Sequence, residues 1–93
     1  MERMERFLIA EEPGLGLEEA RHRLESLVGA ARDRWCARLM REVLPSRFFG
    51  AFLAPKAVNR DYERLRPFLG RARPLWDWVI LGGRAQGLLP EPR

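Results

Sequence analysis

The stretch that decides the fold is LEEARHRLESLVGAARDRWCARLMREVL, residues Leu17–Leu44, which Pro45 follows directly. Its first turn carries Glu18 and Glu19 and its last turn carries Arg41, the charge arrangement that a helix dipole favours. Apolar residues recur in it at spacings of three and four, which is typical of an amphipathic helix. These residues are Leu17, Ala20, Leu24, Leu27, Ala31 and Trp35. We therefore predict one long helix over this stretch.

The apolar face of this predicted helix changes direction along its length. Apolar residues from Leu17 to Trp35 lie on one arc, whereas those from Trp35 to Val43 lie on a second arc, rotated by roughly 100°. Gly29 lies near the change, and a glycine costs a helix only about 1 kcal/mol relative to alanine. We expect a continuous helix with a weak point at Gly29, and the alternative is a break or bend there.

The segments on either side of this stretch are shorter and less decided. Phe7–Ala10 is apolar and could form a short strand or a helical turn. After Pro45, Ser46 can cap a short helix over Arg47–Ala54. The aromatic content of Phe48–Leu53 also suits a strand, and this alternative remains open.

Proline and glycine mark the remaining elements. Pro55 can open a helix that ends before Pro67, because the residue before a proline disfavours helical geometry. Pro74 can open a last helix that runs through Leu81 or beyond. Gly82 and Gly83 offer one stop for it and Gly87 a later one, and residues 88–93 are expected to form a loose tail.

The bulk composition fits a single small domain. The 93 residues are 46% hydrophobic and 32% charged, which is a globular composition. We predict a mainly α domain over residues 1–93, with four or five helices, one of them long. The alternative is a small α+β domain with strands at Arg6–Ala10 and Arg47–Leu53.

Basic charge is concentrated in the second part of the chain. The formal net charge is +4, and all but one of the basic residues are arginine. Residues 1–31 sum to −3 and residues 32–93 to +7. Arg34, Arg38 and Arg41 project within roughly 60° of one another on the predicted helix, opposite its second apolar arc. This exposed stripe is a candidate for nucleic-acid or anion contact, and its alternative is an ordinary solvated helix face.

The sequence favours no catalytic, metal or cofactor site. His22 is the only histidine, and its neighbour Glu18 shares the outward face of the predicted helix. Cys36 is the only cysteine and lies on an apolar arc, so we expect a small inert hydrophobe. One histidine and one cysteine do not match the number and spacing of ligands in a zinc site. We expect no enzyme activity and no cofactor.

The compartment is expected to be the cytoplasm. A single cysteine suits a reducing environment, because it excludes an internal disulfide. The charged start of the sequence is unlike a signal peptide, and no apolar run approaches the roughly 20 residues of a membrane span.

The last predicted helix is apolar on nearly all sides over Leu75–Leu81. Such a helix either lies centrally in the core or leaves one face for a partner, and exposed tryptophans are frequent hot spots of binding. The candidate partner-binding residues are Trp76, Trp78, Leu81 and Trp35. We therefore expect a non-catalytic protein-interaction module or accessory subunit, a homo-oligomer or one with an obligate partner. The alternative is a weak, largely sequence-independent nucleic-acid-binding protein.

Overall fold

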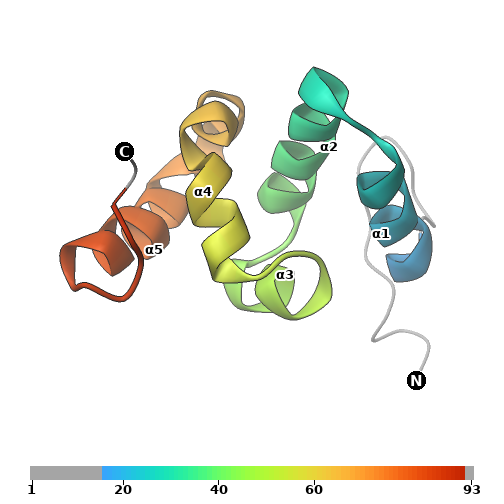
Figure 1. Cartoon of the computed structure of the whole chain (residues 1–93). Coiled ribbons are helices and arrows are strands. Elements are labelled where there is room, and N and C mark those ends of the chain that lie inside the picture. The colour runs from blue at the N-terminus through green and yellow to red at the C-terminus, as the bar shows by residue number, and fades with distance from the viewer. Residues whose placement is uncertain (1–15, 92–93) are drawn as a thin grey trace.

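The computed structural model describes residues 16–91, which form helices joined by short connections (Figure 1). The elements in chain order are α1 (Leu17–Ser26), α2 (Gly29–Glu42), α3 (Pro45–Ala51), α4 (Pro55–Leu65), the 3-10 turns η2 (Arg66–Phe68) and η3 (Gly70–Ala72), and α5 (Arg73–Ala85). Residues 16–91 contain no β-strand, so the prediction of a mainly α domain is confirmed. The expectation for Phe7–Ala10 lies outside the described residues.

The prediction of one long helix over Leu17–Leu44 is wrong. The helix ends at Ser26, Leu27 and Val28 are extended, and α2 begins at Gly29 with a φ of +62°. A left-handed φ is open to glycine because it lacks a Cβ atom. The chain therefore turns at Gly29, near the change in direction of the apolar face.

The turn at Gly29 lets α1 pack back against α2 (Figure 1). The indole Nε1–H of Trp35 in α2 donates a 3.1 Å hydrogen bond to the backbone oxygen of Ala20 in α1. The guanidinium carbon of Arg23 lies 4.5 Å from the centre of the Trp35 ring. These contacts across the break hold α1 on α2.

Residues 48–53 belong to a helix and its end, not to a strand. α3 begins at Pro45, which suits a first helical position because its φ is fixed and it has no N–H. The cap residue is Leu44, and the expected cap by the Ser46 side chain is absent. Phe48 is fully buried, with its ring centre 5.3 Å from that of Trp76 in an edge-to-face pair. The aromatic content of this segment therefore builds the core.

The last two long helices agree with their proline and glycine signals. α4 spans Pro55–Leu65, as predicted. α5 continues through Gly82 and Gly83 and stops before Gly87, which has a φ of +77°. Leu89 and Pro90 then contact the fold, because the side chain of Leu89 packs over Gly83 and the backbone oxygen of Pro90 accepts a 2.8 Å hydrogen bond from Asn59.

The core is centred on α2, α4 and α5. Its largest fully buried side chains are those of Trp76, Tyr62 and Phe48. Cys36 is also fully buried, and desolvation raises the pKa of its thiol to about 12. The buried position of Cys36 agrees with its place on the predicted apolar arc, and a thiol with a raised pKa is mostly protonated near neutral pH.

Candidate functional site

The candidate site lies on α5, whose inner face is fixed in the core. Trp76 and Ile80 are fully buried there. The Nε1–H of Trp76 donates a 2.8 Å hydrogen bond to the backbone oxygen of Met40 at the end of α2. Trp76 therefore belongs to the core and is not available to a partner.

A buried arginine ties the end of α5 to α4. Arg84 is 8% exposed, and its Nε and Nη2 donate to the side-chain and backbone oxygens of Asn59 at 2.6 and 3.0 Å. Its Nη1 also donates to a carboxylate oxygen of Glu63 at 2.8 Å. The hydrogen bond from Arg84 lowers the pKa of Glu63. Because Asn59 also binds the backbone at Pro90, this network joins α4, α5 and the segment after α5.

A second polar cluster fixes the beginning of α5. Asp77 accepts a 2.7 Å hydrogen bond from the Tyr62 hydroxyl. It also accepts a bidentate pair of hydrogen bonds from Arg66, at 2.8 and 3.0 Å. Arg73, four residues earlier in the chain, lies 3.7 Å from Asp77. The Arg66 hydrogen bond lowers the pKa of Asp77, and burial raises the pKa of Tyr62. Together with Arg84, this cluster sets the rotation of α5 about its own axis.

With its rotation fixed, α5 turns a second apolar stripe outward. Leu75, Trp78, Gly82 and Ala85 follow one another at spacings of three, four and three, so they lie on one side of the helix. Trp78 is 75% exposed and Leu75 is 42% exposed. A large exposed indole beside a glycine on a rigid helix gives a surface with both a projection and a hollow.

The hollow is a groove of about 240 Å³ beside Trp78. Its lining residues are Trp78, Val79, Gly82, Gly83, Gln86 and Leu88. All six are uncharged, and one of them, Leu88, is 73% exposed. A Cβ atom added at Gly82 would meet no other atom within 4 Å, so the space above this glycine is open. The groove is therefore an apolar surface without a charged group to bind a phosphate or a metal ion.

The four predicted partner-binding residues are divided by the structure. Trp78 lines the groove, whereas Trp76 is fully buried, Trp35 is 6% exposed and Leu81 packs against the core. Sequence reasoning missed Leu75, Gly82 and Leu88. The heptad spacing of Leu75, Trp78, Gly82 and Ala85 is the signal that could have found most of this stripe.

The predicted arginine stripe is not one exposed row. Arg34 is exposed, but Arg38 is half-buried, with its guanidinium carbon 5.4 Å from the centre of the Trp35 ring. Arg41 is exposed and donates a 2.7 Å hydrogen bond to the backbone oxygen of Phe68. The expectation that all three project freely is wrong for Arg38, because the Trp35 ring that it covers lies at the packed α1–α2 contact.

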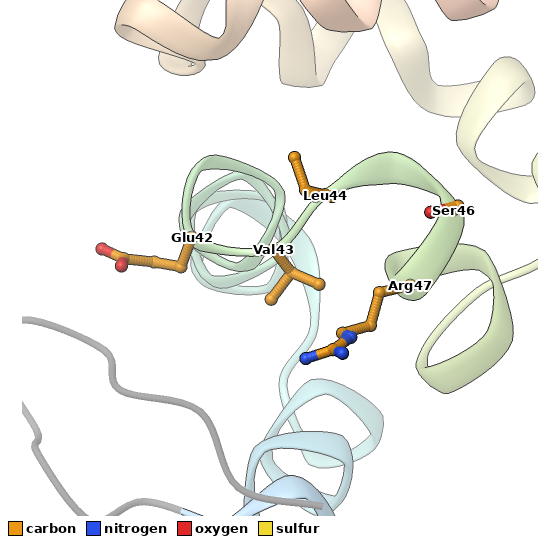
Figure 2. Close-up of a pocket in the computed structure, with 5 residues that line it drawn as sticks. All are labelled: Glu42, Val43, Leu44, Ser46 and Arg47. Atoms are coloured by element: carbon orange, nitrogen blue, oxygen red, sulfur yellow. The ribbon is translucent and has the colours of Figure 1, made fainter. Parts of the chain in front are cut away.

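Two further hollows lie on the described part of the chain. One, of about 340 Å³, is lined by Arg23, Leu27, Ala31, Arg34, Trp35 and Arg38. The other, of about 330 Å³, lies where α2 meets α3 and is lined by Glu42, Val43, Leu44, Ser46 and Arg47. Figure 2 shows that Glu42 and Arg47 extend from different sides of this second hollow. Its polar side chains do not converge on a common point, so it offers no arrangement for acid–base chemistry.

The described residues hold no group of histidine, cysteine and acidic side chains that could bind a metal ion. His22 is exposed on α1 and lies 3.5 Å from the hydroxyl of Ser26. Within residues 16–91, no helix has the length and apolar character to cross a membrane.

Comparisons with protein-family models, with curated proteins and with solved structures give no match to this chain.

Proposed function

We propose that this domain is a non-catalytic protein-interaction module that docks an apolar protein surface on the outer face of α5. The observation that carries the proposal is the 75% exposure of Trp78 beside an uncharged groove. Adjacent exposed apolar side chains mark interaction surfaces, and tryptophan is among the residues most enriched at binding hot spots. Leu75 and Leu88, at 42% and 73% exposure, enlarge the apolar surface around Trp78.

The size and chemistry of the groove support a protein side chain as its occupant. Its volume of about 240 Å³ is below the roughly 300–1,000 Å³ of small-molecule pockets. Small-molecule sites also use a few placed polar groups, whereas Gln86 is the only polar side chain among the six lining residues. An apolar side chain needs no such groups, and the groove can bury one.

The anchoring of α5 supports the same proposal. Trp76, Asp77 and Arg84 hold the helix through contacts with α2, α4 and η2. The outer face is therefore presented in one orientation before any partner arrives. A preformed surface loses less conformational entropy on binding, which raises affinity for a given contact area.

The +7 balance of residues 32–93 adds no second candidate function. Arg64 contacts both Asp33 and Asp61, Arg66 contacts Asp77, and Arg84 contacts Glu63. The +7 balance already subtracts these carboxylates, so these ion pairs do not remove it. The predicted stripe, with Arg38 half-buried, does not present three phosphate contacts in a row.

The test uses the immobilised chain as bait in a lysate of its native organism. Wild type, Trp78→Ala and the control Leu44→Ala are compared, since Leu44 is 67% exposed but lies outside the groove. Both substitutions are at exposed sites and should change the free energy of unfolding by no more than about 0.5 kcal/mol. We expect specific protein retention by wild type and Leu44→Ala, loss with Trp78→Ala, and no effect of nuclease.

Amide hydrogen exchange on the captured complex then locates the contact. Protection confined to residues 75–88 supports the proposal. Equal retention by Trp78→Ala and wild type, or retention that nuclease abolishes, contradicts it.

A further inference from the structure

We infer that the outer face of α5 binds a second copy of this chain in an antiparallel, two-fold symmetric helix pair. This inference rests on the proposed function, because it names the occupant of the same groove. It is carried by the order of side-chain sizes along the outer stripe, which is complementary to itself when reversed.

The stripe has a large half and a small half. Leu75 and Trp78 come first and are exposed, whereas Gly82 and Ala85 follow at the same spacing. In an antiparallel pair centred between Trp78 and Gly82, each Trp78 lies opposite Gly82 of the second copy. Leu75 then lies opposite Ala85 of the second copy. Large residues meet small ones along the whole stripe, which is how facing helices fill the space between them.

A two-fold interface requires this kind of self-complementarity. In such an interface one surface patch is used by both copies, so a residue that contacts a second position is itself contacted by that position in return. Here the projection and the hollow belong to the same face, since Trp78 borders the groove that Gly82 and Gly83 line. Each copy can insert its own indole into the groove of the other.

The net charge of the molecule predicts how salt affects this association. Each copy carries a net charge of +4, so two copies repel one another at long range. The groove residues are uncharged, and they allow contact without placing like charges face to face. Salt screens the long-range repulsion, so added salt should strengthen this association. Binding to a nucleic acid would weaken under the same change.

The contact area is small. From Leu75 to Ala85 the stripe runs about 15 Å along the helix axis. One helix from each copy buries less than the roughly 1,200 Å² typical of stable complexes, which places the pair among weak and transient associations. Association must therefore be followed from micromolar to near-millimolar concentration.

The first measurement is sedimentation equilibrium of the full chain over that concentration range. Wild type should form dimers that tighten with added salt. Gly82→Gln fills the groove at a position where the space outside the helix is open, so it should fold normally and lose the dimer. Trp78→Ala should weaken association at least about 30-fold, the size of a hot-spot loss. Leu44→Ala should leave association unchanged, and circular dichroism checks the fold of each variant.

The second measurement tests the antiparallel register by cross-linking. Leu75→Cys and Ala85→Cys proteins are mixed and oxidised mildly, with Trp78 and Gly82 left intact. Buried Cys36, whose thiol pKa is raised to about 12, does not compete. A mixed disulfide should form in preference to either homodimeric disulfide. In the proposed pair, identical residues lie about 15 Å apart along the axis, beyond the reach of a disulfide.

The outcomes separate this inference from the proposed function. A preference for Leu75→Cys homodimers indicates a parallel pair and overturns the inference. Wild type that stays monomeric at every concentration also overturns it, and if capture from lysate still depends on Trp78, the proposed function stands. If neither self-association nor Trp78-dependent capture occurs, both fail.

Discussion

Trp76 and Trp78 are separated by a single residue in α5, yet the first is fully buried and the second is 75% exposed. Trp76 donates its indole N–H to Met40 and meets the edge of the Phe48 ring. Trp78 borders an open groove. The same residue type on the same helix therefore serves the core on one face and an open surface on the other.

Polar contacts account for this division better than apolar content does. The segment Leu75–Leu81 is apolar on nearly all sides, so hydrophobicity alone leaves the rotation of the helix undecided. Asp77 and Arg84 decide it through their hydrogen bonds to Tyr62, Arg66 and Asn59. A few polar contacts therefore determine which tryptophan is buried.

The largest expected effect is at the buried tryptophan. Trp76→Ala should lower the free energy of unfolding by about 3–5 kcal/mol, because it leaves a cavity in the core. It also removes the donor to the backbone oxygen of Met40. Trp78→Ala should change it by no more than about 0.5 kcal/mol. Urea denaturation followed by circular dichroism measures both free energies, and similar losses from the two substitutions would show that Trp78 also supports the fold.

A smaller loss is expected at the buried anchor. Arg84→Met keeps an apolar stem but leaves the oxygens of Asn59 without their donor, which should cost about 1–3 kcal/mol. The matched control is Glu63→Gln, because Glu63 is the solvent-exposed partner of the same arginine, with 57% of its side chain accessible. Denaturation curves should show Arg84→Met as the more damaging change. The opposite order would remove Arg84 as the anchor of α5.

Two glycines should respond to alanine with opposite signs. Gly29 has a φ of +62°, where an L residue costs about 1–2 kcal/mol, so Gly29→Ala should destabilise the fold by that amount. Gly82 is inside α5 with open space around its Cα atom, so Gly82→Ala should stabilise the fold by about 0.4–1 kcal/mol. Thermal unfolding gives both signs. Stabilisation by Gly29→Ala would restore the continuous helix.

The smallest expected effect depends on pH and concerns Asp77. Its pKa in the folded protein is lowered, chiefly by the Arg66 hydrogen bond, so the folded state favours the charged carboxylate. The resulting stability is present above the unfolded-state pKa of about 4 and is lost as pH falls through the lower folded-state pKa. The stability difference between wild type and Asp77→Asn should therefore shrink below about pH 4. A difference that stays constant into acid would show that the charge of Asp77 does not anchor the helix.

Much of the helical layout could be predicted from local sequence, but the break at Gly29 could not. Prolines at 45 and 55 mark the starts of α3 and α4, and Gly87 marks the end of α5. A break at Gly29 removes helix hydrogen bonds. Only the burial of α1 against α2 compensates for their loss. That gain depends on contacts such as Trp35 with Ala20, which exist only once the chain has turned.

The candidate site could be predicted only in part. The apolar character of Leu75–Leu81 on nearly all sides indicates a helix that is central or leaves one face for a partner. Trp78 was among the predicted partner-binding residues. Which tryptophan faces outward depends on partners that are distant in sequence, such as Asn59, which is 25 residues from Arg84. The same limit explains the error at Arg38, since its partner ring at Trp35 lies at a contact between two helices.

We propose that the outer face of α5 serves association and is not needed for folding. The most direct test measures unfolding free energy and sedimentation of Trp78→Gln on one preparation, beside wild type. We expect a free energy of unfolding within about 0.5 kcal/mol of wild type together with loss of the dimer. A loss of several kcal/mol, or a dimer as strong as that of wild type, would contradict it.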